Sequence, residues 1–181
     1  KPEVKIATIE DPIEYSVPRI GQTQVNSATG LDFATGLRAL LRHDPNIIMV
    51  GEIRDQETAD ISINAALTGH LVLSTLHTND APSTLTRLID LGVQPFLIVA
   101  TVRVVVAQRL VRRLCPTCSE PQSLTEDEVR YLASLTGFSE SELTSKDWRK
   151  PKGCDECTNG YRDRFGIHEV FIITESIHDL I

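Results

Sequence analysis

The sequence predicts an α/β fold with a largely parallel sheet, followed by a small module built around four cysteines. Short apolar segments alternate along the chain with segments of helical periodicity, which is the pattern of strand–helix–strand units. Two of the apolar segments run directly into polar residues, as strands do when a site lies at the carboxyl ends of a parallel sheet. All four cysteines fall into two close Cys-x-x-Cys pairs, which indicates a separate metal-binding module.

Length and composition are those of a globular protein. The chain has 181 residues, of which 41% are hydrophobic and 24% charged, enough for one domain of about 100–200 residues or one domain with a small addition. The formal net charge of −7 argues against a dominant nucleic-acid-binding surface. The N-terminus carries neither Met nor an apolar signal segment, so we expect the chain to begin inside a larger protein.

The first strand is expected over Val4–Ile9, which is rich in β-branched residues. Three carboxylates, Glu10, Asp11 and Glu14, then crowd one loop. Like charges repel, so such a cluster usually faces a cation or bound water, although taken alone a solvated acidic turn is the more common interpretation. A short strand or hairpin arm is expected over Gly21–Asn26.

A helix is expected over Leu31–Asp44, with Asp32 as its N-cap. Arg38 and Arg42 are four residues apart on it and are therefore neighbours on one face. Two such arginines can grip a polyphosphate, whereas a solvated basic face is the more common arrangement.

The segment from Asn46 to Asp55 is predicted to carry the main functional residue. Its apolar run Ile47–Val50 has the length of a buried strand and leads into Gly51 and Glu52. Ligands of parallel sheets bind just beyond the carboxyl ends of the strands. Glu52 is therefore expected at a site, and the alternative is an acidic turn without function.

A helix over Glu57–Thr68, ending at Gly69, leads to a second predicted buried strand over His70–Leu76. Polar residues gather where that strand ends, at the edge expected for Glu52. A lone histidine is usually structural, but His77 is followed by Thr, Asn and Asp at a strand end. It is well placed there to sense a phosphate.

The longest apolar stretch is Pro95–Ala107, which follows a helix predicted over Ser83–Leu91. It is shorter than the ~20 residues that a membrane span needs. We therefore predict a buried helix that leads into the local basic cluster of Arg109, Arg112 and Arg113.

The paired cysteines predict a structural zinc site. Zinc takes four thiolates in a tetrahedron, and a site with all four positions filled by cysteine leaves no place for a substrate. The segment between the pairs is longer than the usual ~15–20 residues and carries two capping-box patterns, at Thr125–Glu128 and Ser139–Glu142. A redox dithiol is the minor alternative, and the acidic insert disfavours a nucleic-acid-binding ribbon. The predicted ligands are Cys115, Cys118, Cys154 and Cys157.

Together, these segments resemble the C-terminal ATPase portion of the secretion ATPases of type II secretion and type IV pilus assembly, which are hexameric motors with a RecA-like P-loop core. Ile9–Tyr15 resembles the Asp box of that family, Ile47–Asp55 its Walker B box and Leu67–Asn79 its His box. The tetracysteine module resembles that of the export and pilus-assembly branch. The resemblance covers the whole chain and divides it into a partial RecA-like core (1–114), a tetracysteine zinc-binding subdomain (115–160) and a return to the ATPase domain (161–181).

The resemblance implies roles for individual residues. Glu52 would orient or deprotonate the attacking water, in keeping with the positioning and charge neutralisation that phosphoryl transfer needs. Glu10, Asp11 and Glu14 would lie near Mg²⁺ and its waters, and His77 with Thr68 would sense the γ-phosphate. Implied nucleotide contacts are Arg38, Arg42, Arg54, Arg162 and Arg164.

The implied protein is a cytosolic homo-hexamer that hydrolyses ATP with Mg²⁺ and contains structural Zn²⁺. Platform proteins of the secretion or pilus system would hold it at the inner membrane, and no nucleic acid is involved. Thr35 stands where relatives often carry Arg, and the sequence contains no G-x-x-x-x-G-K-[ST] phosphate-binding loop. We therefore expect the isolated chain neither to bind ATP tightly nor to hydrolyse it. The alternative function is a non-enzymatic, zinc-bearing protein-interaction module.

Overall fold

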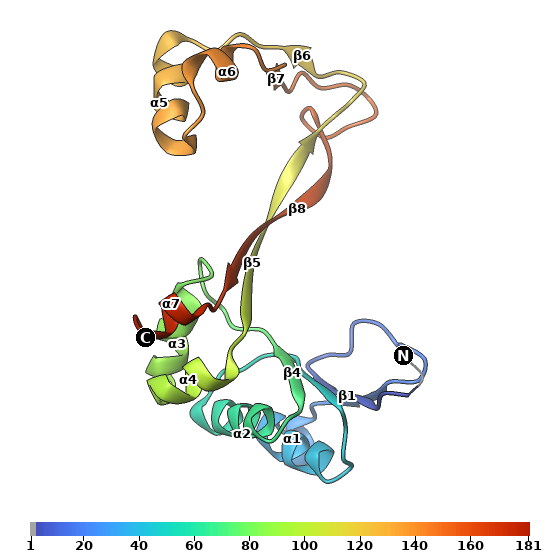
Figure 1. Cartoon of the computed structure of the whole chain (residues 1–181). Coiled ribbons are helices and arrows are strands. Elements are labelled where there is room, and N and C mark those ends of the chain that lie inside the picture. Colours follow the sequence, from blue (N-terminus) through green and yellow to red (C-terminus); the bar gives the residue numbers. More distant parts are fainter. Residues whose placement is uncertain (1–2) are drawn as a thin grey trace. The chain divides into compact units, whose positions relative to one another are not determined.

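The structure is a computed structural model that describes residues 3–181 and divides into two compact units (Figure 1). The core unit consists of residues up to Ala107 together with His168–Ile181, and the cysteine unit consists of Gln108–Ile167. The cysteine unit extends beyond the predicted 115–160 in both directions, because it includes parts of the two long strands that flank this segment.

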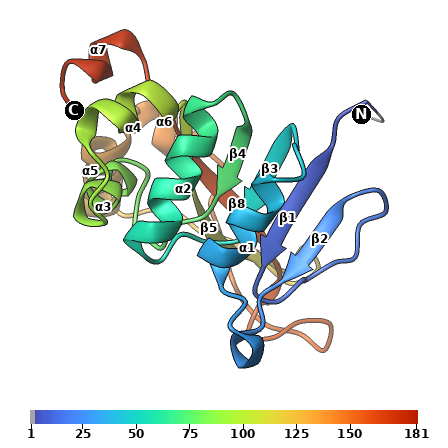
Figure 2. The same cartoon turned by 90° about the horizontal axis from the view of Figure 1, so that it is seen from below.

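The core unit contains a four-stranded sheet in the order β2-β1-β3-β4, with all strands parallel (Figure 2). Its strands are β1 (Ile6–Glu10), β2 (Gly21–Gln24), β3 (Ile47–Val50) and β4 (Leu71–Ser74). The predicted parallel α/β fold is thereby confirmed. Ile9, Ile48 and Val50 on the two inner strands are fully buried, as expected for strands with neighbours on both sides.

The prediction that the second strand is buried is wrong. Leu71 and Leu73 of β4 are 55% and 51% exposed. The reason is position, since β4 is the edge strand of the sheet formed by the described residues. An edge strand has a neighbour on one side only, whatever the hydrophobicity of its sequence.

Two helices, α1 (Phe33–Leu41) and α2 (Gln56–Leu67), pack against each other and against the sheet (Figure 2). Each begins at an aspartate whose side chain accepts a backbone hydrogen bond. Asp32 accepts from the N–H of Thr35 at 2.7 Å, which confirms it as the N-cap, and Asp55 accepts from the N–H of Thr58 at 2.8 Å. These caps fix where each helix begins after its preceding segment.

The predicted helix over Pro95–Ala107 is only partly present. Helix α4 covers Pro95–Thr101, and the chain then extends as strand β5 (Val104–Leu114). Consecutive β-branched residues favour extended backbone, and β5 pairs with β8 (Tyr161–Ile172). None of the helices in residues 3–181 is long and apolar enough to cross a membrane.

The remaining helices of the core unit are η1 (Ser27–Thr29), α3 (Ser83–Asp90) and the short α7 (Glu175–His178). Ile98 of α4 and Ile173, which follows β8, join Ile9 and Leu37 in one hydrophobic core. The core unit is thus completed by the C-terminal segment of the chain.

The cysteine unit contains α5 (Glu126–Thr136), α6 (Glu140–Thr144) and a small antiparallel pair, β6 (Glu120–Pro121) with β7 (Arg149–Lys150). Both predicted capping boxes are present, since Thr125 and Ser139 each exchange hydrogen bonds with the glutamate three residues later. Only Cys115, Val129 and Leu143 are buried apolar residues in this unit. So small a core cannot hold a unit of this size together without further support.

Candidate functional site

The carboxyl ends of β1, β3 and β4 meet at one edge of the sheet. In the register of the strands, Val50 lies beside Ile9 on one side and Ser74 on the other. Hydrogen bonds continue this ladder beyond the strands, from the N–H of Gly51 to the oxygen of Ile9 (2.8 Å) and from the N–H of Ile53 to the oxygen of Thr75 (3.0 Å). The residue between them, Glu52, is therefore held from both sides.

Gly51 allows this close arrangement. A Cβ atom at this position would lie 3.1 Å from the carbonyl oxygen of Ile9 and 3.3 Å from the Cα of Glu10. Both are backbone atoms, which cannot move away without disturbing the ladder. The Gly-Glu pair thus brings the backbone of Glu52 against the start of the acidic loop.

Glu52 is a largely buried carboxylate, and one of its oxygens is paired with both Arg54 and His77. Its side chain is 12% exposed, and Oε2 accepts hydrogen bonds from Nε of Arg54 and from Nε2 of His77, the latter at 3.2 Å. The hydrogen bond from Arg54 lowers the pKa of Glu52, burial opposes this, and His77 lowers it further. No described residue donates a hydrogen bond to Oε1. Glu52 is therefore ionised at neutral pH, with one oxygen available to a bound molecule.

The predicted acidic cluster is divided between two environments. Glu10 is buried, and its Oε1 accepts from the hydroxyl of Thr8 (2.5 Å) and from Nε2 of Gln22 (3.0 Å) on β2. Asp11 is exposed, and its charge adds to that of Glu52 in raising the pKa of Arg54. Glu14 is exposed further along the loop. Glu10 and Asp11 thus lie at the Glu52 edge of the sheet, which suits Mg²⁺ because this ion prefers oxygen ligands.

Other predicted site residues lie elsewhere in the chain. Thr68 ends α2, and its hydroxyl donates to the carbonyl of Ala65 at 2.9 Å. It therefore precedes β4, whereas His77 follows that strand, and the structure does not bring the two together. Arg38 forms an ion pair with Glu57 on α2 instead of facing the sheet edge.

The other arginines predicted to contact nucleotide are divided between the two units. Nε of Arg42 donates to the carbonyl of Arg38 at 3.4 Å. Arg162 and Arg164 lie on the part of β8 that belongs to the cysteine unit, where Arg162 is 4.0 Å from Glu156. Their nucleotide contacts stay predictions.

A contact that sequence reasoning missed holds the loop that carries His77. Oε2 of Glu169, on β8, accepts a hydrogen bond at 2.8 Å from the backbone N–H of Ala81, which is fully buried. Asp80 caps the start of α3 through the N–H of Ser83 (2.8 Å). Glu169 is 88 residues from Ala81 in the sequence and belongs to no motif. Nothing in its sequence neighbourhood signals the contact.

We expect Glu169→Ala to loosen the loop after β4. The buried N–H of Ala81 would lose its acceptor, and an unsatisfied buried donor costs about 1–3 kcal/mol. Amide hydrogen exchange of the 181-residue chain should become faster at Ala81. Glu169→Gln keeps an acceptor oxygen and should restore most of the protection. Equal protection in the Ala variant would show that the contact does not hold the loop.

The four cysteines form one cluster, with their sulfur atoms all within 4.8 Å of one another. The separations are 4.0 Å for Cys115 and Cys154, 3.7 Å for Cys118 and Cys157, and 3.7 Å for Cys154 and Cys157. A tetrahedral zinc ion with Zn–S bonds of ~2.3 Å spaces its sulfurs about 3.8 Å apart. The donor set and its spacing thus fit zinc.

The protonation of these thiols also suits a cation. Burial raises the pKa of Cys115, but the N–H groups of Thr117 and Cys118 outweigh it and lower that pKa to about 7. The hydrogen bond from the N–H of Glu156 lowers the pKa of Cys154. Burial and the three neighbouring thiols outweigh it and raise that pKa to about 12. Cys154 therefore retains its proton until a cation neutralises the crowded sulfurs, whereas Cys115 loses its proton more readily.

The family described as Type II/IV secretion system protein matches residues 1–181. Type II secretion system protein E of Aeromonas hydrophila is 51% identical over 177 residues, which are 97% of this chain and 34% of that protein. Type IV pilus assembly ATPase TfpB of Acinetobacter baylyi is 53% identical over 180 residues, 99% of this chain and 30% of that protein.

Solved structures of related ATPases are also similar to this chain. The crystal structure of the pilus retraction motor PilT with bound ADP superposes with a TM-score of 0.67 at 28% identity, covering 98% of this chain and 41% of that one. The X-ray structure of the Legionella pneumophila ATPase DotB gives a TM-score of 0.62 at 27% identity, covering 98% and 39%. This chain spans about a third of the length of the two curated relatives above. By the match over its whole length, it belongs to the type II/IV secretion system protein family.

Proposed function

We propose that this chain is the part of a motor ATPase that supplies the catalytic carboxylate, and that the motor drives type II secretion or type IV pilus assembly. The observation that carries the proposal is Glu52, which is ionised, held at the carboxyl edge of a RecA-like sheet, and left with Oε1 unpaired among the described residues. The names of the relatives support the motor class. A scaffold has no evident use for a carboxylate so placed.

The proposed mechanism assigns a task to each group at the edge. Oε1 of Glu52 accepts a hydrogen bond from the attacking water and takes up its proton as the water reacts. Arg54 and His77 hold the other oxygen, so the carboxylate points one way. His77 lies on the loop after β4, where its hydrogen bond to Glu52 can be replaced by one to a phosphate oxygen. Its side chain is 85% exposed, which leaves room for that movement.

Magnesium and ATP fit the acidic side of this edge. Glu10 and Asp11 would bind the waters of Mg²⁺, and Mg²⁺ would neutralise charge on the transferred phosphoryl group. Zinc in the cysteine cluster would be structural, because all four coordination positions are filled by protein ligands. We further propose a cytoplasmic homo-hexamer held at the inner membrane through platform proteins of the secretion or pilus machinery.

Turnover measurements test the proposal directly. The intact protein that contains this chain should hydrolyse ATP with Mg²⁺, whereas the 181-residue chain should not, because it has no Walker A phosphate-binding loop. Both would be measured as phosphate release at matched concentrations, with zinc content as the control for folding. If the intact protein shows no turnover, the result favours the alternative function of a zinc-bearing interaction module. Comparable turnover by the short chain would refute the expected dependence on the missing loop.

A further inference from the structure

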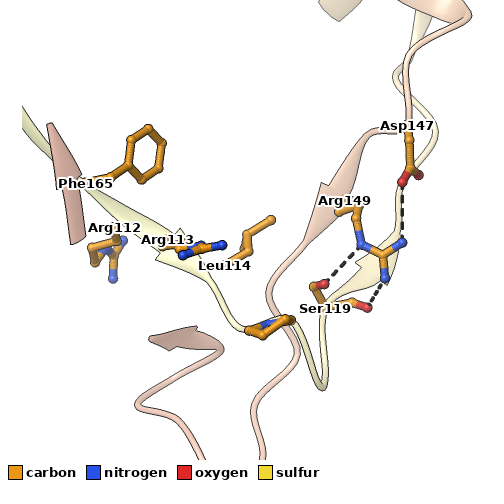
Figure 3. A pocket seen from close by; sticks show the side chains of 8 residues that line it. Arg112, Arg113, Leu114, Ser119, Asp147, Arg149 and Phe165 are labelled. Carbon is orange, nitrogen blue, oxygen red and sulfur yellow. Dashed lines mark hydrogen bonds and ion pairs between the residues drawn. The ribbon is translucent and has the colours of Figure 1, made fainter. Parts of the chain in front are cut away.

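The cysteine unit carries an open hollow that the proposed ATPase site does not use. Its volume is about 680 Å³, and its walls include Arg112, Arg113 and Arg149 together with Leu114 and Phe165 (Figure 3). We call it the arginine hollow. Every residue that lines it belongs to the cysteine unit, whereas Glu52 belongs to the core unit.

Two of the three arginines of the hollow, Arg112 and Arg149, are held in place by side-chain contacts. Arg149 donates to the hydroxyl of Ser119 (3.0 Å) and lies 3.5 Å from Asp147. The guanidinium of Arg112 stacks 3.9 Å from the ring centre of Tyr161. Arg113 forms no hydrogen bond, ion pair or ring contact with any described residue. Three cations thus face one carboxylate, and two of the cations have already lost part of their conformational freedom.

The chemistry of the walls selects the kind of ligand. Phe165 is 50% exposed and lies near Arg112 (Figure 3). A free phosphate binds to converging N–H donors and would make no favourable contact with an apolar wall. An anionic membrane is flat and would not fit a concave surface. A ligand with carboxylates next to apolar side chains would suit both parts of the hollow. Arginine forms bidentate pairs with carboxylates, and burial of the aromatic ring is favourable.

The same unit carries a lobe of that chemistry. The lobe comprises α5 and α6, residues 124–145, and contains five carboxylates against a single arginine. On α5, Tyr131 and Leu135 are 65% and 64% exposed, and their four-residue spacing places them on one face. The side chains of Glu126 and Glu140 have no partner in the part of the chain that the structure describes. The lobe thus carries exposed apolar side chains and unpaired carboxylates, the two kinds of group that the hollow would accept.

We propose that the α5–α6 lobe of one copy of this chain docks into the arginine hollow of the next copy. None of the residues that line the hollow comes from α5 or α6, so the lobe of the same unit does not occupy it. The contact joins two different surfaces and is therefore head-to-tail. A contact between one lobe and one hollow is expected to bury less than a standard interface of ~1,600 Å². It is accordingly weak between free chains and gains strength where copies are already held together.

Charge reversal on the 181-residue zinc-loaded chain tests this contact. Three variants are compared with the parent chain by sedimentation velocity, over concentrations up to ~1 mM at low salt. They are Arg113→Glu in the hollow, Glu126→Lys with Glu140→Lys in the lobe, and the combination of all three substitutions. Arg87→Glu, on the exposed surface of α3, makes the same charge change outside the unit and is the matched control. Zinc content and circular dichroism verify folding.

The expected pattern is specific to two surfaces that meet. The parent chain and Arg87→Glu associate with the same affinity. Each variant altered on one surface associates at least roughly tenfold more weakly, and the combined variant recovers the affinity of the parent chain. A parent chain that stays monomeric throughout overturns the proposal, and so does association that ignores Arg113. Flotation with phosphatidylglycerol vesicles is the last arm. Arg113-dependent binding of monomeric chain to these vesicles would reassign the hollow to lipid.

Discussion

Glu52→Gln in the intact protein is expected to lower ATP turnover by roughly 10²–10⁴-fold while nucleotide binding is retained. The amide keeps the size of the side chain and can still accept a hydrogen bond on one oxygen. It cannot take up a proton from the attacking water. The loss is expected to fall on kcat, because the affected step is chemical and the sheet edge proposed to bind nucleotide is unchanged.

The measurement is steady-state phosphate release combined with equilibrium binding of a fluorescent ATP analogue. Asp60→Asn is the matched control, since it removes one exposed carboxylate from α2 without touching the sheet edge. It should leave turnover near that of the parent. Unchanged turnover in Glu52→Gln would remove Glu52 from the chemical step and with it the main support for the proposed mechanism.

Loss of zinc is expected to unfold the cysteine unit while the core unit remains folded. Structural zinc contributes apparent free energies of about 10–16 kcal/mol in zinc-finger peptides at neutral pH. The cysteine unit has only Cys115, Val129 and Leu143 as buried apolar residues, so little else holds it. The core unit has its own continuous hydrophobic core and contains none of the four ligands.

A strong chelator and the Cys154→Ser variant should have the same effect, seen as rapid amide exchange and protease cleavage within residues 119–153. Thr117→Ala, which alters the same loop and keeps all four thiols, is the control and should retain one zinc ion. Persistence of full protection in the chelated chain would show that the cluster is not what folds the unit. Elemental analysis of the untreated chain measures the bound metal.

Much of the core unit was predictable because local signals and tertiary structure agree there. Asp32 marked a helix start, and Ile47–Val50 had the length and composition of a strand buried on both sides. The position of Glu52 followed from strand direction alone. The cysteine cluster followed from its spacing. In each case the short-range pattern leaves few alternatives.

The wrong and missed predictions have one physical cause: these features depend on contacts with residues far away in the sequence. Residues 102–107 are apolar enough for a buried helix or a strand, and pairing with β8 decides for the strand. Leu71 and Leu73 look buried, but exposure depends on how many strands flank β4. Glu169 shows no pattern at all, since its partner is a backbone N–H far away in sequence. Single-sequence periodicity does not contain these facts.

The order in which the chain is synthesised gives the divided core unit a further consequence. Ile173, which belongs to the hydrophobic core, and Glu169, which holds Ala81, both follow the cysteine unit in the sequence. All four cysteines leave the ribosome before either residue. Because domains fold as units during synthesis, the cysteine cluster can capture its metal while the core is still incomplete. Metal supply then acts on a nascent chain, before the sheet edge with Glu52 has its final support.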